Sequence, residues 1–186
     1  MKRMILAAAA ASILAASAIA QTSEVGKRAE NQQDRVAQGV KSGQLTAGET
    51  SNLEKKESAI NQEVKTDRTL NGGTLTAGER KQVNRQQNQM SGQISNDKHN
   101  AATQHYGNNQ VDARRENQQD RIANGIASGK MNAAQASKVE KSEAGINHEV
   151  KSDRAANGGK LTQAEKKQVN QQQNKQSRTI YKDKHK

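Results

Sequence analysis

Apolar residues are spaced along most of this chain as they are on one face of an α-helix. Leu53, Ile60 and Val64 are seven and four residues apart, and such steps keep side chains on the same side of a helix. The chain has no proline, the residue that most strongly interrupts a helix. We therefore predict an all-α fold. The predicted helices span residues 24–41, 47–70, 77–97, 110–127, 133–156 and 163–183.

The sequence is a tandem duplication. When it is shifted by 86 positions, residues 30–99 align with residues 116–185, and the runs ENQQDR, NGG and DKH recur in register. Three predicted helices fall in each copy, so we expect a tandem duplication of a three-helix bundle of helix-loop-helix type. The division is repeat 1 at residues 21–99, a linker at 100–115 and repeat 2 at 116–186. Because the apolar stripes are narrow, packing of the two copies or self-association would add stability to thin cores.

The N-terminus has the pattern of a secretory signal peptide. Lys2 and Arg3 precede an apolar run over residues 4–14, and small residues follow as far as Ala20. The apolar run is shorter than the roughly 20 residues that cross a bilayer, so we expect no transmembrane anchor after cleavage. Residues 1–20 are therefore the predicted signal peptide, Gln21 is the first mature residue, and the protein is periplasmic or secreted.

Four segments carry the signature of a helix start. In each, a Thr or Asn stands three positions after a glycine, and a Glu or Gln stands three positions after that Thr or Asn. Such a pair can form a capping box, in which each residue satisfies a free amide of the other, while the glycine ends the preceding helix. The predicted cap pairs are Thr46 with Glu49, Thr76 with Glu79, Asn132 with Gln135, and Thr162 with Glu165.

The same four segments resemble the loops of the EF-hand family. Glycine at loop position six, an aliphatic residue or Met at eight, and Glu or Gln at twelve follow that family's pattern. These positions are Gly43, Leu45 and Glu49; Gly73, Leu75 and Glu79; Gly129, Met131 and Gln135; and Gly159, Leu161 and Glu165.

The resemblance implies two helix-loop-helix units per copy that share the middle helix. The family's carboxylate ligands at loop positions one, three and five are absent. Calcium binding would therefore need a displaced register that recruits Asp67 or Asp153. The alternative interpretation of the same residues is a helix-breaking turn followed by a capped helix.

Composition excludes several kinds of chemistry. The 186 residues include no Cys, which excludes disulfides, thiolate metal sites and a cysteine nucleophile. Acidic residues are interleaved with basic ones over residues 54–57 and again over 140–143, as on a solvated helix face. His99, His105, His148 and His185 lack metal-ligand spacing. We expect a protein that is not an enzyme and has no cofactor or bound metal.

The net charge of +11 includes Lys2 and Arg3, so the mature chain carries +9. Residues 30–99 contribute +1 and residues 116–185 contribute +5. The excess lies on the final helix and tail, where basic residues spaced three, four, seven or eleven apart can share a face and favour a polyanion. A solubility charge is the alternative interpretation. The candidate polyanion-binding residues are Lys160, Lys167, Lys175, Arg178 and Lys182.

The repeated ENQQDR run, at residues 30–35 and 116–121, has two interpretations. One is a buried network of amides and ion pairs between helices, and the other is a surface that contacts a partner. We predict an exported, non-enzymatic helical repeat protein that acts as a structural or protein-interaction module, through self-association or an unknown protein partner. Electrostatic binding of an envelope or extracellular polyanion, such as polysaccharide, lipopolysaccharide or nucleic acid, is the second interpretation, and calcium binding is the third.

Overall fold

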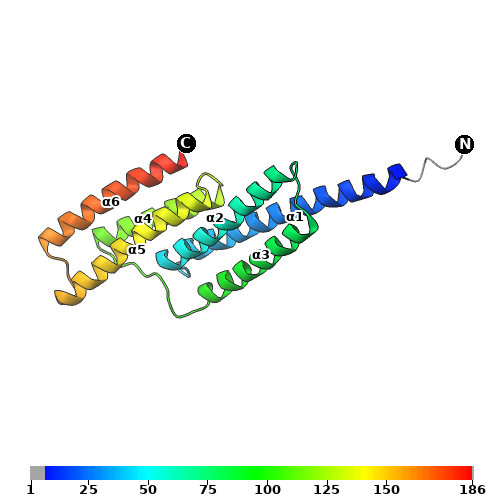
Figure 1. Ribbon diagram of the computed structural model, residues 1–186. Helices are drawn as coiled ribbons and strands as arrows, with labels where there is room; N and C mark the ends of the chain where they lie inside the picture. Colours follow the sequence, from blue (N-terminus) through cyan, green and yellow to red (C-terminus); the bar gives the residue numbers. More distant parts are fainter. Residues whose placement is uncertain (1–6, 186) are drawn as a thin grey trace, which may run out of the picture.

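Residues 7–185 form a bundle of six helices (Figure 1). The computed structural model describes the backbone of residues 7–185 and the side chains of residues 24–185, and residues 7–185 contain no β-strand. The all-helical prediction is therefore confirmed. The helices are α1 (Ala7–Lys41), α2 (Ala47–Leu70), α3 (Ala77–Lys98), α4 (Gln110–Ala127), α5 (Ala133–Ala156) and α6 (Gln163–Lys184).

Helix α1 is longer than predicted, because it continues toward the N-terminus as far as Ala7. This extra part is rich in alanine, the residue that most favours a helix, and it projects beyond the other helices in Figure 1. The predicted signal peptide, residues 1–20, lies outside the side chains that the structure describes. Within the described residues, no helix combines the length and the hydrophobicity needed to cross a bilayer.

The two copies share one central core. Helices α1–α3 come from copy one and α4–α6 from copy two; α2 packs on α5 and α1 packs on α4 (Figure 1). Packing of the two copies is one of the two ways in which the thin cores are expected to gain stability, and the largest apolar cluster draws on both copies. From copy one it contains Val36, Ala37, Val40, Leu45, Leu53, Met90 and Ile94, and from copy two Ile122, Ala123, Ile126, Met131, Ala136, Val139 and Ile180.

Each copy also has a small outer cluster of its own. Val25, Ile60, Val64, Leu75 and Val83 form it in copy one. The residues 86 positions later form it in copy two: Val111, Ile146, Val150, Leu161 and Val169. The bundle therefore has an apolar cluster at its centre and a smaller one in each copy.

The segment that joins the copies is shorter than the predicted linker of residues 100–115. Helix α4 already begins at Gln110, because the Asn109 side chain accepts hydrogen bonds from the amides of Val111 and Asp112, at 3.1 and 3.2 Å. We call residues 99–109 the connector. The connector is bonded to copy one, since the backbone amide of Gln104 donates to the Gly43 carbonyl oxygen at 2.8 Å.

Candidate functional site

The predicted polyanion-binding residues all lie on the exposed side of copy two. Lys160 precedes α6, and Lys167, Lys175, Arg178 and Lys182 lie along that helix with exposed side chains. At 3.6 residues per turn, these four fall within about 80° of the helix circumference. The buried residues of α6, including Val169, Gln173 and Ile180, lie on the opposite side.

No acidic side chain of α6 shares this basic face. The Glu165 carboxylate accepts a 2.7 Å hydrogen bond from the Thr162 amide, and Asp183 is buried. At the end of the helix the exposed Tyr181 ring stacks on His185, with 4.2 Å between ring centroids. The face therefore combines several cations with one aromatic stack.

Copy one has no equivalent of this face. The positions 86 residues before the five cations are occupied by Thr74, Lys81, Gln89, Gly92 and Asn96. Only one of them is basic. The charge difference between the copies is therefore concentrated on the outer face of one helix.

The four cap pairs each form a capping box. Thr46, Thr76, Asn132 and Thr162 accept from the amide three positions on, and the partner Glu or Gln side chain accepts from the amide of the cap residue. In the turns before them the glycines have positive φ, as at Gly43 (+70°) and Gly129 (+65°). The glutamates at EF-hand position twelve are thus hydrogen-bonded to their own helix starts.

Metal chemistry has few candidates here. Among the described residues, no three His, Cys, Asp or Glu side chains are placed to hold one ion. His99 and His185 each contact a carbonyl oxygen of their own helix at 2.7 Å. Calcium binding stays a prediction of the EF-hand resemblance. A fall in melting temperature on addition of a chelator would support it, and an unchanged melting temperature would contradict it.

No family model, curated protein or solved structure matches this chain. Function has therefore to be inferred from its own residues.

The repeated ENQQDR run supplies buried amides between helices. Gln32 Nε2 donates to the Gln87 carbonyl oxygen at 2.6 Å and to Ser91 Oγ at 2.9 Å. Gln118 makes the same two contacts in copy two, with Gln173 and Ser177. These bonds join the first helix of each copy to its third.

Four glutamates correct the prediction of a solvated face over residues 54–57 and 140–143. Glu54, Glu57, Glu140 and Glu143 are fully buried. The lysines between them are exposed. The reason is that α2 and α5 each pack on several neighbouring helices, so the buried surface is wider than one apolar stripe. The sequence spacing could have indicated the burial of Glu57, because this residue is four positions after Leu53 and three before Ile60, on the same side of the helix.

Burial changes the acidity of these carboxyl groups. It raises the pKa of Glu54 to about 8 and that of Glu57 to about 7. In copy two, burial raises the pKa of Glu143 to about 7 and that of Glu140 well above its ordinary value. The repulsion between Glu54 and Glu140 adds to the effect on Glu140, so the two copies are electrostatically coupled.

Proposed function

We propose that this protein is an exported, non-enzymatic interaction module that binds an anionic polymer through the basic face of α6. The observation that carries the proposal is that Lys167, Lys175, Arg178 and Lys182 share one exposed face of α6, with the exposed Lys160 just before this helix. An anionic polymer that lies along the helix would contact these charges together and release counterions. The N-terminal sequence supports export to the periplasm or beyond the cell.

The test is binding to labelled heparin, lipopolysaccharide and DNA over a salt series. The logarithm of affinity should fall linearly with the logarithm of salt concentration. A variant in which Lys167, Lys175, Arg178 and Lys182 are changed to Gln should have a slope shallower by up to about 4, since each lost phosphate-type contact removes about 0.9. Absence of binding at low salt would overturn the proposal.

A matched control separates the α6 face from overall charge. Lys55, Lys65, Lys141 and Lys151 are exposed on α2 and α5, and changing them to Gln removes the same total charge. This control should keep most of the salt slope. An equal loss in both variants would mean that net charge alone drives binding.

Protein–protein interaction is the second candidate function. The shared core gives each copy the packing partner that self-association would otherwise have provided. A different feature supports a partner, namely a cavity between α1, α2 and the α4–α5 turn that is lined by three acidic side chains and no basic one. Retention of a protein on the immobilised chain, with loss of retention in a variant of this cavity, would support the interaction role.

A further inference from the structure

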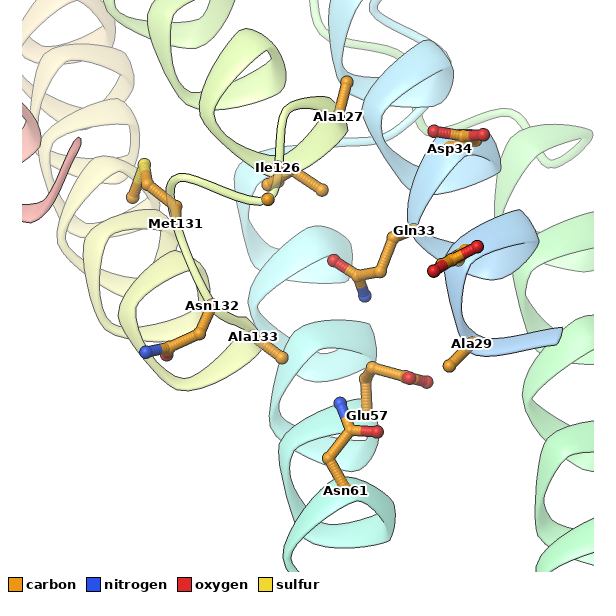
Figure 2. Close-up of a pocket in the computed structure, with 12 residues that line it drawn as sticks. Ala29, Gln33, Asp34, Glu57, Asn61, Ile126, Ala127, Met131, Asn132 and Ala133 are labelled. Atoms are coloured by element: carbon orange, nitrogen blue, oxygen red, sulfur yellow. The ribbon is translucent and has the colours of Figure 1, made fainter. Parts of the chain in front are cut away.

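A cavity of about 260 Å³ lies between the two copies (Figure 2). Helices α1 and α2 form two of its sides, and the turn between α4 and α5 forms another. Its lining includes the carboxylates of Glu30, Asp34 and Glu57 and contains no Lys or Arg. Glu30 and Asp34 are exposed, whereas Glu57 is fully buried. The cavity is therefore acidic at its exposed edge and also in its interior.

The polar groups inside this cavity are poorly paired. No hydrogen bond of good geometry reaches either carboxylate oxygen of Glu57 or leaves the Nε2 atom of Gln33. Weaker contacts of Asn61 with Glu57, and of Gln33 with Glu54, lower the pKa values of these two carboxyl groups but do not outweigh their burial. Figure 2 shows the Glu57 carboxyl group extending from α2 toward Ala29 on α1. A poorly paired buried carboxyl is costly, so a cation at this place would be favourable.

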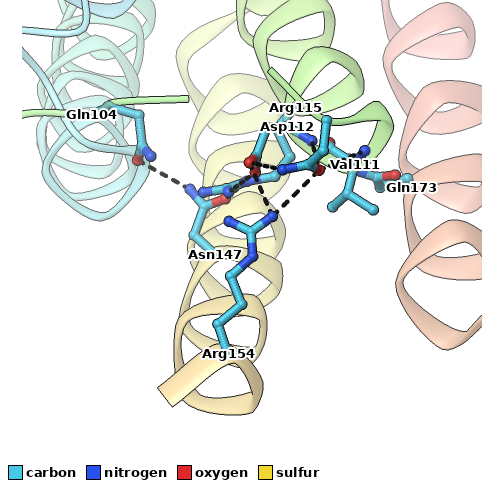
Figure 3. Close-up of polar contacts among 8 residues, drawn as sticks. Gln104, Val111, Asp112, Arg115, Asn147, Arg154 and Gln173 are labelled. Atoms are coloured by element: carbon cyan, nitrogen blue, oxygen red, sulfur yellow. Dashed lines mark hydrogen bonds and ion pairs between the residues drawn. The ribbon is translucent and has the colours of Figure 1, made fainter. Parts of the chain in front are cut away.

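The corresponding place in copy two already holds a cation (Figure 3). Ala29 corresponds to Arg115, Glu57 to Glu143 and Asn61 to Asn147, each 86 residues later. The Arg115 side chain is buried; its Nε donates to Asn147 Oδ1 at 2.6 Å, and its Nη1 donates to Asp112 Oδ1 at 2.8 Å. The Arg115 charge also lowers the pKa of Glu143, against the larger effect of burial.

The connector completes the site in copy two. The Arg115 guanidinium lies over the Tyr106 ring, 5.2 Å from its centroid. Asn147 Nδ2 donates to Gln104 Oε1 at 3.1 Å, and the backbone amide of Gln104 donates to the Gly43 carbonyl oxygen. Gly43 corresponds to Gly129, which lines the cavity in copy one. In copy one, alanine stands in place of the arginine and Gly26 stands in place of its ion-pair partner Asp112, so Glu57 is the buried carboxylate left to face a cation there.

We propose that this cavity binds a guanidinium group supplied by another molecule, in the place that Arg115 occupies in copy two. The buried Glu57 carboxylate offers planar acceptors, and Asn61 Oδ1 is the counterpart of the Asn147 oxygen that accepts from Arg115; such acceptors suit the fixed fork of guanidinium donors. Glu30 and Asp34 attract the cation to the entrance. The source is either an arginine side chain of a polypeptide or a small guanidino compound. This site is independent of the basic face of α6.

The first test is calorimetric titration of the full chain with N-acetyl-arginine amide. Its citrulline analogue has the same shape without the charge. We expect saturable one-to-one binding of the arginine probe and at least about tenfold weaker binding of the citrulline probe. N-acetyl-Arg-Tyr amide separates the two sources, because tighter binding of this dipeptide points to a polypeptide and equal binding points to a small compound. Equal binding of arginine and citrulline probes, or no saturation with arginine, would overturn the proposal.

Matched variants locate the binding. Glu57→Gln should lower the affinity for the arginine probe at least about tenfold. Glu143→Gln, the counterpart change in copy two, should alter this affinity less than about twofold. Ala29→Arg should fill the cavity from within the chain and abolish binding while the circular dichroism spectrum stays helical. Equal loss in the Glu57 and Glu143 variants, or unchanged binding in Ala29→Arg, would contradict the assignment.

The pH dependence provides a further readout. Because Glu57 must be ionised to bind a cation, affinity should fall between about pH 8.5 and pH 5.5. Glu30 and Asp34 face this carboxyl from α1, and Glu54 precedes it on α2; the lining residues of the α4–α5 turn include no titratable side chain. In Glu57→Gln the remaining affinity should change much less over this range, and the residual change comes from the neighbouring Glu54. A flat profile in the parent protein would count against Glu57 as the ligand.

Discussion

Ser51 and Ser137 bond to each other's backbone where α2 meets α5. The Ser51 hydroxyl donates to the Ser137 carbonyl oxygen at 2.9 Å, and the Ser137 hydroxyl donates to the Ser51 carbonyl oxygen at 2.8 Å. The two residues are 86 positions apart, so each is the counterpart of the other in the duplication. Reciprocal contacts of this kind are typical of two-fold symmetric dimers, here formed within one chain.

A larger side chain at this contact should separate the two helices. Ser51→Leu is expected to lower the free energy of unfolding by about 1–3 kcal/mol, because no space is available for the added carbons. Ser51→Ala should cost at most about 1.5 kcal/mol, since it removes only one hydrogen bond. Urea denaturation measures both. The exposed Ser142 provides the control, and Ser142→Leu should have little effect; an equal cost at both positions would contradict the packing described here.

The shared core predicts that the two copies unfold together. Leu53→Ala removes a fully buried side chain in copy one and should cost about 2–5 kcal/mol. Both tyrosines, Tyr106 and Tyr181, lie outside copy one. Their fluorescence should nevertheless report the same lowered midpoint as circular dichroism. A tyrosine transition that stays at the parent midpoint would show that the copies unfold separately.

The buried glutamates predict that the fold is more stable in mild acid than in base. The raised pKa values of Glu54 and Glu140 mean that the folded chain binds protons more tightly than the unfolded chain. Their contribution is complete below the ordinary value of 4.5 and is lost as the pH rises to about 8 and beyond. The melting temperature should therefore fall between about pH 5 and pH 8.5.

Variants test whether the buried glutamates cause this pH dependence. The double change Glu54→Gln and Glu140→Gln should reduce the slope of the profile, because neutral amides replace two of the titrating groups; the remaining slope comes from Glu57 and Glu143. Glu24 is exposed, and Glu24→Gln should leave the profile unchanged. In stronger acid the profile should turn downward, because the hydrogen bond from the Thr76 amide lowers the pKa of Glu79 in its capping box. A melting temperature that rises from pH 5 to pH 8.5 would contradict the burial of these groups.

The capping boxes predict a local cost at helix starts. Thr76→Ala removes the side-chain acceptor for the Glu79 amide and should lower the free energy of unfolding by about 1 kcal/mol. Thr162→Ala should cost about as much, since its geometry in copy two is the same. Thr69 is exposed inside α2, and Thr69→Ala should be neutral or stabilising because alanine favours a helix. Equal effects at residues 69 and 76 would argue against the cap.

The amino-acid sequence by itself determined where the helices lie. Five of the six predicted helices agree with the structure to within one residue at each end. The reason is that helix starts and ends depend on neighbours within four residues, as in the pair Thr46 and Glu49. The basic residues of the final helix also share a face by spacing alone.

Only the tertiary structure decided which helices of the two copies pack together and which charged side chains become buried. Glu54 and Glu57 appear in a charged run, yet the packing of α2 between other helices buries them. The contact of Ser51 with Ser137 and the placement of the connector beside Arg115 join residues far apart in the chain. Such contacts depend on how whole helices pack, which local spacing does not encode. The sequence contains the difference between Ala29 and Arg115, but only packing showed that these positions lie beside the buried Glu57 and Glu143.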